Sequence, residues 1–231
     1  MKVKFTFIIP TLNEGGYLED CIKSIKKQAR KDYEIIVVDS YSKDRTVNIA
    51  KKYGAKVLFE KRKGPGIARN TGAKHARGEI IVFADADVRF ETDFLDKLER
   101  KFGMGIGGCI FFLKLYDARN NLQRTSYNMA NYIAYLLISF GIPITAGSCF
   151  AYKKSIFKKL GGFNPNFLTN EDHELAERVN KIKKFVFFHD ISVYTSSRRV
   201  ANFGIIKSVI MYAKSTFVYF LNHGYLRDYW K

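Results

Sequence analysis

Residues 79–87 read EIIVFADAD, an apolar run that ends in two aspartates. Two earlier runs have the same form, FTFIIPTLNE at residues 5–14 and EIIVVDSYS at residues 34–42. Segments with the polar-faced pattern of helices separate the runs. This alternation predicts βαβ units that wind a parallel sheet in a right-handed sense. The sequence therefore predicts an α/β fold with a mixed, mostly parallel sheet flanked by helices.

Apolar periodicity and turn residues give the expected positions of helices and strands. The strands should lie at Phe5–Pro10, Glu34–Asp39, Lys56–Glu60, Glu79–Asp85, Cys109–Leu115 and Ser148–Tyr152. The helices should lie at Gly16–Ala29, Arg45–Tyr53, Gly66–Ala76 and Glu171–Asn180, with a tyrosine-rich helix that ends near Phe140. No linker or internal repeat divides the chain, so both halves should share one sheet in a single domain.

The charge of the chain narrows the possible ligands. The 231 residues include 39 Lys and Arg against 22 Asp and Glu, a formal net charge of +17. Such a charge attracts anions, but no zinc-finger spacing, RNP-like motif or helix-turn-helix pattern accompanies it. We therefore expect an anionic membrane or a diphosphate ligand rather than nucleic acid.

Two features bear on the cellular location. The cysteines are far apart in apolar surroundings, which favours reduced core thiols in the cytoplasm: Cys21, Cys109 and Cys149. No signal-type segment precedes the first strand, so secretion is not expected. The stretch between Arg124 and Lys153 carries no charge, but Gly141 and Pro143 interrupt it. These breakers favour a helix followed by a strand over a membrane span.

Polar clusters follow the first, second and fourth expected strands. They read PTLNE at residues 10–14, DSYS at 39–42 and DAD at 85–87. The carboxyl ends of strands line the ligand crevice of an open α/β sheet. These three clusters should therefore meet at one site.

Four motifs in this order resemble those of family-2 glycosyltransferases, the inverting enzymes with the GT-A fold. They are FIIPTLNE at 7–14, VVDSYSKDRT at 37–46, ADAD at 84–87 and NEDHELAER at 170–178. The similarity continues through GSCFAYKK at 147–154, LGGFN at 160–164 and TSSRR at 195–199. The last of these, with the closing helix, resembles a small soluble subgroup from bacteria and archaea.

This resemblance implies transfer of a sugar from a UDP- or GDP-type nucleoside-diphosphate sugar to a hydroxyl acceptor, a glycan or a lipid-linked molecule. Residues 1–202 would form the GT-A domain, with a nucleotide-binding half at 1–100 and an acceptor half at 101–202. Residues 203–231 would form an amphipathic helix and an aromatic, basic tail. The protein would work in the cytoplasm or at the cytoplasmic face of the membrane.

Asp85 and Asp87 are the expected metal ligands. Loss of a nucleoside diphosphate needs a divalent cation to neutralise the departing charge, and carboxylate oxygens suit Mg²⁺ or Mn²⁺. Asp87 is the stronger candidate, because Asp85 can also act through water or by holding the nucleoside sugar. The alternative is that both aspartates only cap a helix or face solvent.

Asp172 is the expected catalytic base. It matches the catalytic acid of the family motif at a helix start, where the helix dipole favours an ionised carboxylate. As a base it would activate an acceptor hydroxyl for in-line attack opposite the diphosphate, with inversion at the anomeric carbon. Alternatively, Asn170, Glu171 and Asp172 only cap the helix.

The resemblance also implies a set of donor-binding residues. Asp39 would accept the imide hydrogen of the base, although an Asx turn is a second explanation. Arg69, at a helix N-terminus, would face phosphate. Arg198 and Arg199 would lie near the diphosphate or an anionic acceptor, or form surface ion pairs. The remaining members of the set are Pro10, Thr11, Asn13, Glu14 and Asp85. The four histidines, at 75, 173, 189 and 223, are interpreted as structural.

Three alternatives stay open. In a polyprenyl-phosphate sugar synthase, Asp172 would only help to orient the acceptor, because an anionic phosphate needs no base to remove a proton. A nucleotidyltransferase would usually carry a glycine-rich loop with a cation after the first strand, and this loop has none. A non-catalytic module would bind nucleotide sugars at a membrane surface. Membrane contact would use Lys207 and Lys214 with the tail aromatics Tyr225, Tyr229 and Trp230; otherwise that helix simply covers the sheet.

Overall fold

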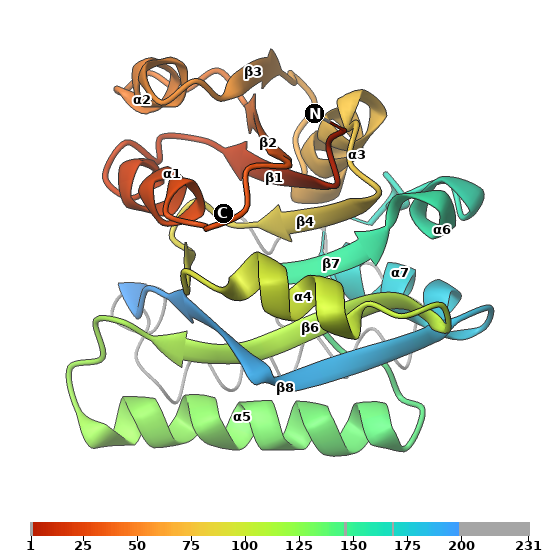
Figure 1. The fold of residues 1–231 in the computed structure, drawn as a ribbon. Coiled ribbons are helices and arrows are strands. Elements are labelled where there is room, and N and C mark those ends of the chain that lie inside the picture. The colour runs from red at the N-terminus through yellow and green to blue at the C-terminus, as the bar shows by residue number, and fades with distance from the viewer. Residues whose placement is uncertain (1, 146, 168, 199–231) are drawn as a thin grey trace.

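The computed structural model describes residues 2–145, 147–167 and 169–198. Its strands form one eight-stranded sheet in the order β3-β2-β1-β4-β7-β6-β8-β5 (Figure 1). The strands are β1 Phe5–Thr11, β2 Tyr33–Asp39, β3 Lys56–Phe59, β4 Ile80–Ala84, β5 Arg89–Phe90, β6 Ile106–Leu115, β7 Cys149–Lys153 and β8 Lys184–Thr195. The helices are α1 Leu18–Lys26, α2 Thr46–Lys52, α3 Pro65–His75, α4 Phe94–Lys101, α5 Asn121–Ser139, α6 Lys154–Lys159 and α7 Glu171–Asn180.

The first four strands form the parallel part of the sheet. β1 pairs with β2 on one side and with β4 on the other, and β2 pairs with β3, all in parallel. Their buried positions are mainly Ile, Val and Phe, which suit a strand covered on both faces. The parallel register brings the carboxyl ends of β1, β2 and β4 to the same edge, as the sequence predicts.

The second half extends the same sheet with mixed directions. β7 pairs antiparallel with both β4 and β6, while β6 and β8 run parallel and β5 pairs antiparallel with β8. The prediction of a mixed, mostly parallel sheet flanked by helices is confirmed. β7 begins at Cys149, slightly later than the sequence analysis expects, and the positions of α4, α6 and β5 were not predicted.

Two apolar clusters cover the two faces of the sheet. α1, α2 and α4 contribute to one cluster, and α3, α6 and α7 contribute to the other. All three cysteines are buried free thiols, as expected for core residues. In the part of the chain that the structure describes, no helix is both long and apolar enough to cross a membrane.

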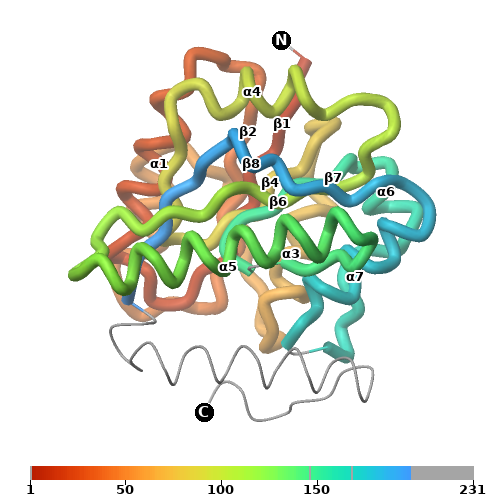
Figure 2. The backbone as a smooth tube through the Cα atoms, turned by 90° about the horizontal axis from the view of Figure 1, so that it is seen from below, coloured from red at the N-terminus to blue at the C-terminus, as the bar shows by residue number. Residues whose placement is uncertain are grey.

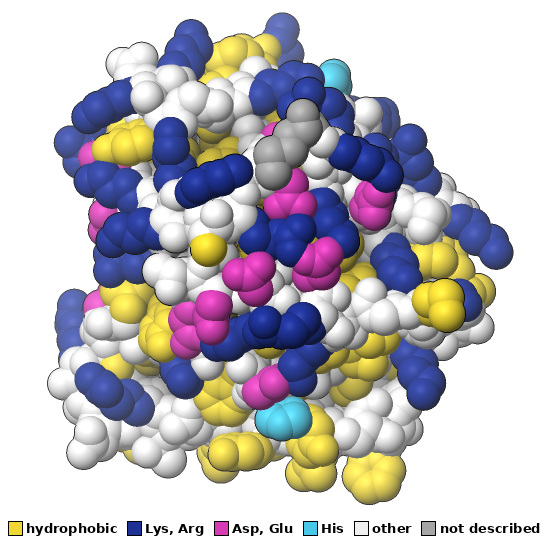
Figure 3. All heavy atoms as spheres, viewed as in Figure 1, with side chains coloured by type: hydrophobic (Ala, Val, Ile, Leu, Met, Phe, Trp, Pro, Cys, Tyr) yellow, Lys and Arg dark blue, Asp and Glu magenta, His cyan; other side chains and the backbone are white. Residues whose placement is uncertain are grey.

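Among the described residues, α5 is covered on one side only. It packs against β6 and β8, and Figure 2 shows it lying across the molecule beside them. Its outer face is apolar, with exposed side chains of Leu122, Met129, Tyr132, Ile133, Leu136 and, just past its end, Phe140. Figure 3 shows hydrophobic side chains along the lower edge of the molecule, where α5 lies in Figure 1. The uncharged stretch between Arg124 and Lys153 therefore contains a surface helix and then β7, which confirms the prediction of a helix followed by a strand.

Candidate active site

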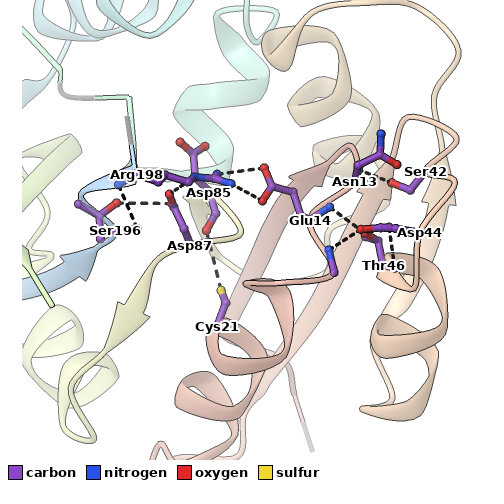
Figure 4. Close-up of polar contacts among 12 residues, drawn as sticks. Asn13, Glu14, Cys21, Ser42, Asp44, Thr46, Asp85, Asp87, Ser196 and Arg198 are labelled. Carbon is purple, nitrogen blue, oxygen red and sulfur yellow. Dashed lines mark hydrogen bonds and ion pairs between the residues drawn. The ribbon is translucent and has the colours of Figure 1, made fainter. Parts of the chain in front are cut away.

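Two loops at the carboxyl ends of β1 and β2 are held together by hydrogen bonds. The Asn13 amide donates to Ser42 Oγ at 2.8 Å, and the Lys43 amide donates to Asn13 Oδ1 at 2.8 Å. The Glu14 amide donates to Thr46 Oγ1, also at 2.8 Å (Figure 4). Asn13 has a φ of 55°, a left-handed conformation that asparagine tolerates. The loop after β1 is therefore preorganised and presents Glu14 at the site edge.

Asp39 ends β2 and is fully buried beneath these loops. Its carboxylate accepts hydrogen bonds from Thr11 Oγ1 at 2.8 Å, from the Ser42 amide at 2.7 Å and from Ser42 Oγ at 2.6 Å. The turn-forming role that the sequence allows is thus observed. A carboxylate has about four acceptor positions. The predicted bond to a nucleobase would use the remaining one.

An exposed aromatic pair beside Asp39 was not predicted from the sequence. The rings of Tyr41 and Phe59 lie 5.4 Å apart, and Lys61 Nζ lies 5.9 Å from the Tyr41 ring. Tyr41 has a φ of 62°, a strained conformation for a bulky residue that tends to occur at functional sites. The sequence signal for this pair was a bulky residue, Tyr41, in the turn that follows the predicted binding residue Asp39.

Arg69 joins the end of β4 to the start of α7. Its Nη2 lies 3.2 Å from Asp85 Oδ1 and 3.2 Å from the Gly147 carbonyl oxygen. Its Nη1 lies 2.5 Å from Glu171 Oε1. The guanidinium also lies 5.1 Å from the Phe150 ring centroid. The structure therefore places Arg69 in a buried ion-pair cluster, within which it orders two of the predicted motifs.

Arg198 joins the same acidic motif to the β1 loop. Its Nε lies 2.8 Å from Asp87 Oδ2, and its two Nη atoms lie 2.7 and 3.0 Å from the two Glu14 carboxylate oxygens. The guanidinium lies 4.4 Å from the Tyr17 ring centroid. Figure 4 shows the arginine between the two carboxylates. Thr195 Oγ1 donates to Asp87 Oδ1 at a longer 3.4 Å.

The residues present fit a divalent cation whose remaining ligands would come from a bound nucleotide. Within residues 2–145, 147–167 and 169–198, no group of three acidic, histidine or cysteine side chains could hold a metal by itself. Asp85 and Asp87 stand together after β4 and supply hard oxygen donors. Mg²⁺ is commonly held by one or two carboxylates together with substrate phosphates. Asp87 and Asp85 would hold such an ion in that arrangement.

Asp172 lies in the first turn of α7, beside His173. Its Oδ1 accepts a hydrogen bond from the His173 amide at 3.0 Å, and His173 Nδ1 lies 3.5 Å from the same atom. His173 Nδ1 is also 2.6 Å from Thr145 Oγ1. His173 thus holds Asp172 in place, a function that the sequence analysis missed although the two residues are adjacent.

The two neighbouring carboxyl groups of α7 have opposite pKa shifts. Burial and the charge of Asp172 outweigh the Arg69 guanidinium and raise the pKa of Glu171 to about 7. Burial also acts to raise the pKa of Asp172, but the hydrogen bond and charge of His173 and a bond from Thr145 outweigh it. The pKa of Asp172 therefore lies below its ordinary value, so the Asp172 carboxylate is ionised at neutral pH.

The predicted site residues gather around residues 85–87. Arg69 links Asp85 to the helix of Asp172, and Arg198 links Asp87 to Glu14. Thr11 lies against Asp39 at the neighbouring strand ends, next to Pro10. Arg199 and the predicted helix with Lys207 and Lys214 lie outside the described residues.

A family model described as Glycosyl transferase family 2 matches residues 6–161. Glycosyltransferase GlyA of Streptococcus pneumoniae is 26% identical over 222 residues, which cover 84% of this chain and 32% of that protein. An uncharacterized glycosyltransferase of Rickettsia typhi is 25% identical over 206 residues, 81% of this chain and 62% of that protein. The chain therefore spans less than two thirds of the length of both relatives.

The solved structures with a similar fold are glycosyltransferases of the GT-A type. Staphylococcus aureus TarS in complex with UDP has a TM-score of 0.69 and 21% identity, over 84% of this chain and 60% of that chain. A mannosyltransferase from Pyrobaculum calidifontis in complex with GDP-Man and Mn²⁺ has a TM-score of 0.67 and 21% identity, over 94% and 65%. These similarities confirm the predicted GT-A fold.

Proposed function

This chain belongs to glycosyltransferase family 2, and from that premise we propose that it transfers a sugar from a UDP- or GDP-type donor to a hydroxyl acceptor, with a divalent metal and with inversion. The observation that carries the proposal is the convergence of acidic side chains around residues 85–87. Arg69 brings the helix of Asp172 to Asp85, and Arg198 brings Glu14 to Asp87. Base, metal ligands and donor loop would then act on one substrate.

Each part of the site has a role in the proposed reaction. A bound Mg²⁺ or Mn²⁺ would neutralise charge on the departing diphosphate. Asp87 and Asp85 would hold this ion, while Asp39 and the loop from Pro10 to Glu14 would bind the nucleoside. Arg198, with Arg199, would face the diphosphate.

Asp172 would take the proton of the acceptor hydroxyl. Its lowered pKa supports this role, because the carboxylate is ionised at neutral pH and able to accept a proton. Its contact with His173 would hold the carboxylate in one orientation, from which it can activate the acceptor hydroxyl for in-line attack. A hydroxyl acceptor, a glycan or a lipid-linked molecule, fits a site that contains such a base.

The donor and metal also have support from similar structures. One contains UDP, and another contains GDP-Man and Mn²⁺. Both nucleotide classes therefore remain candidates for this chain, with either Mn²⁺ or Mg²⁺.

We further propose peripheral contact with an anionic membrane at its cytoplasmic face. The exposed apolar face of α5 supports this contact. Cations flank that face at both ends. Arg119 and Arg124 lie at its start, and Lys181, Lys183 and Lys184 follow α7. The end of α7 lies near the end of α5, because Asn180 Nδ2 donates to the Gly141 carbonyl oxygen at 3.2 Å.

Wild-type protein should co-sediment with anionic liposomes, and the double variant Ile133→Glu, Leu136→Glu should co-sediment less. Met104→Glu, at an exposed apolar side chain elsewhere, is the control. Equal recovery with neutral liposomes would contradict the proposal.

The test of the proposed reaction is turnover of UDP- and GDP-sugars with Mn²⁺ or Mg²⁺. We expect hydrolysis or transfer from donors of one base class, and loss of turnover when a chelator removes the metal. Nucleotide binding without turnover of any donor would instead favour a non-catalytic binding module.

A further inference from the structure

The Arg198 guanidinium contacts Asp87, one of the two proposed metal ligands. Its Nε covers Asp87 Oδ2 at 2.8 Å, while its Nη atoms engage both oxygens of Glu14. The ring of Tyr17 lies against the guanidinium. The Glu14 and Asp87 carboxylates are thus bridged by one internal cation, and the Asp87 side chain is only 8% exposed.

A metal ion and the guanidinium compete for this position. Two cations that share one carboxylate oxygen repel each other at this short distance. A metal that binds Asp87 through Oδ2 therefore weakens the contact of Arg198 with the same oxygen. Once displaced, the arginine needs another anion, and a nucleoside diphosphate is the anion that the proposed function brings to the site.

The side chain can move without the backbone. The Arg198 amide donates to Ser196 Oγ at 3.1 Å, and Ser196 Oγ donates to Asp117 Oδ2 at 2.6 Å. The Ser197 amide also donates to Asp117 Oδ1. The chain is thus anchored where it leaves β8. The Arg198 side chain is 30% exposed, so solvent and an incoming anion can reach the guanidinium while it contacts the two carboxylates.

We infer that Arg198 is a positioning residue that occupies the Glu14–Asp87 carboxylates when no donor is bound and exchanges them for the diphosphate when the metal enters. Metal and nucleotide then bind cooperatively, because the metal releases Arg198 from the carboxylates and the diphosphate stabilises the released guanidinium. This inference rests on the proposed function, since it requires a metal-bound nucleoside diphosphate.

The test is Mn²⁺ binding to the whole chain without nucleotide, measured by electron paramagnetic resonance. Arg198→Ala removes the guanidinium that bridges Glu14 and Asp87. It should therefore tighten nucleotide-free Mn²⁺ binding by about fivefold or more, the lower range of typical coupling. The factor by which UDP or GDP improves Mn²⁺ affinity should fall accordingly. Arg198→Lys keeps the positive charge but loses the bidentate guanidinium. Its nucleotide-free Mn²⁺ affinity should therefore lie between those of the wild type and Arg198→Ala.

Arg89→Ala is the matched control. Arg89 also bonds a carboxylate, with Nη2 at 2.7 Å from Asp20 Oδ2, but on the surface and outside the Glu14–Asp87 pair. It should leave Mn²⁺ affinity unchanged, and circular dichroism should show all variants folded. If the wild type binds the Mn²⁺–nucleotide complex, unchanged or weaker Mn²⁺ binding by Arg198→Ala would overturn this inference and leave the proposed function intact. Failure of the wild type to bind that complex would overturn the proposed function and this inference together.

Discussion

Two arginines flank the Asp85–Asp87 motif, and each holds one of its aspartates. Arg69 lies between Asp85 and Glu171 with its side chain 5% exposed. Arg198 lies between Asp87 and Glu14 with its side chain 30% exposed. The chemistry is the same, but the surroundings differ. The buried cluster is suited to hold the motifs together, whereas the cluster of Arg198, which is 30% exposed, is suited to exchange its partner.

The largest expected difference between the two clusters is in stability. Arg69→Ala leaves Asp85 and Glu171 without their shared cation, and breaking a buried pair typically costs about 3–5 kcal/mol. Arg198→Ala removes an arginine that is 30% exposed, so solvent can partly replace it and the loss should be smaller than that of Arg69→Ala. Urea unfolding followed by circular dichroism measures both. Equal losses would show that burial does not separate the two clusters.

The next prediction concerns the carboxylate beside the buried cluster. Asp172→Asn keeps the size of the side chain but removes its proton affinity. Transfer to a hydroxyl acceptor should fall by on the order of a hundredfold or more, while donor binding persists. Glu177→Gln, which affects an exposed pair with Lys181 near the end of the same helix, is the control. Near-normal transfer by Asp172→Asn would remove the base from the mechanism and favour a phosphate acceptor.

The last prediction for the buried cluster is a pH dependence of its stability. The pKa of Glu171 is raised to about 7 in the folded protein from an ordinary value of 4.5, so the folded state binds more protons between these values. Stability should therefore fall as pH rises through this range, and the fall should be smaller in Glu171→Gln. Unfolding free energies of both proteins at several pH values between 4 and 8 test this. Parallel curves would contradict the raised pKa.

The sequence predicts the parallel part of the fold well because its signals are local. Apolar runs and turn residues locate β1 to β4, and the ranges differ from the structure by one or two residues. α7 was predicted from Glu171 to Asn180, as observed. The convergence of the strand ends follows from the parallel topology alone.

The pairing of β7 between β4 and β6 could not be predicted in this way, because it depends on contacts between distant segments. The same applies to the site. Arg69 was expected to face phosphate, but its position between Asp85 and Glu171 depends on how α3 and α7 pack. The contact of Arg198 with Asp87 likewise depends on where β8 ends.

The measurement that tests the account most directly is calorimetric titration of UDP and GDP with and without Mn²⁺, in the wild type and in Asp87→Ala. The wild type should bind one nucleotide more tightly with Mn²⁺. Asp87→Ala should lose this enhancement and keep its fold, because Asp87 lies at a strand end rather than in the apolar core. Asp20→Ala, which removes an exposed carboxylate paired with Arg89, should behave as the wild type. Unchanged Mn²⁺ dependence in Asp87→Ala would contradict the metal site on which the proposed reaction depends.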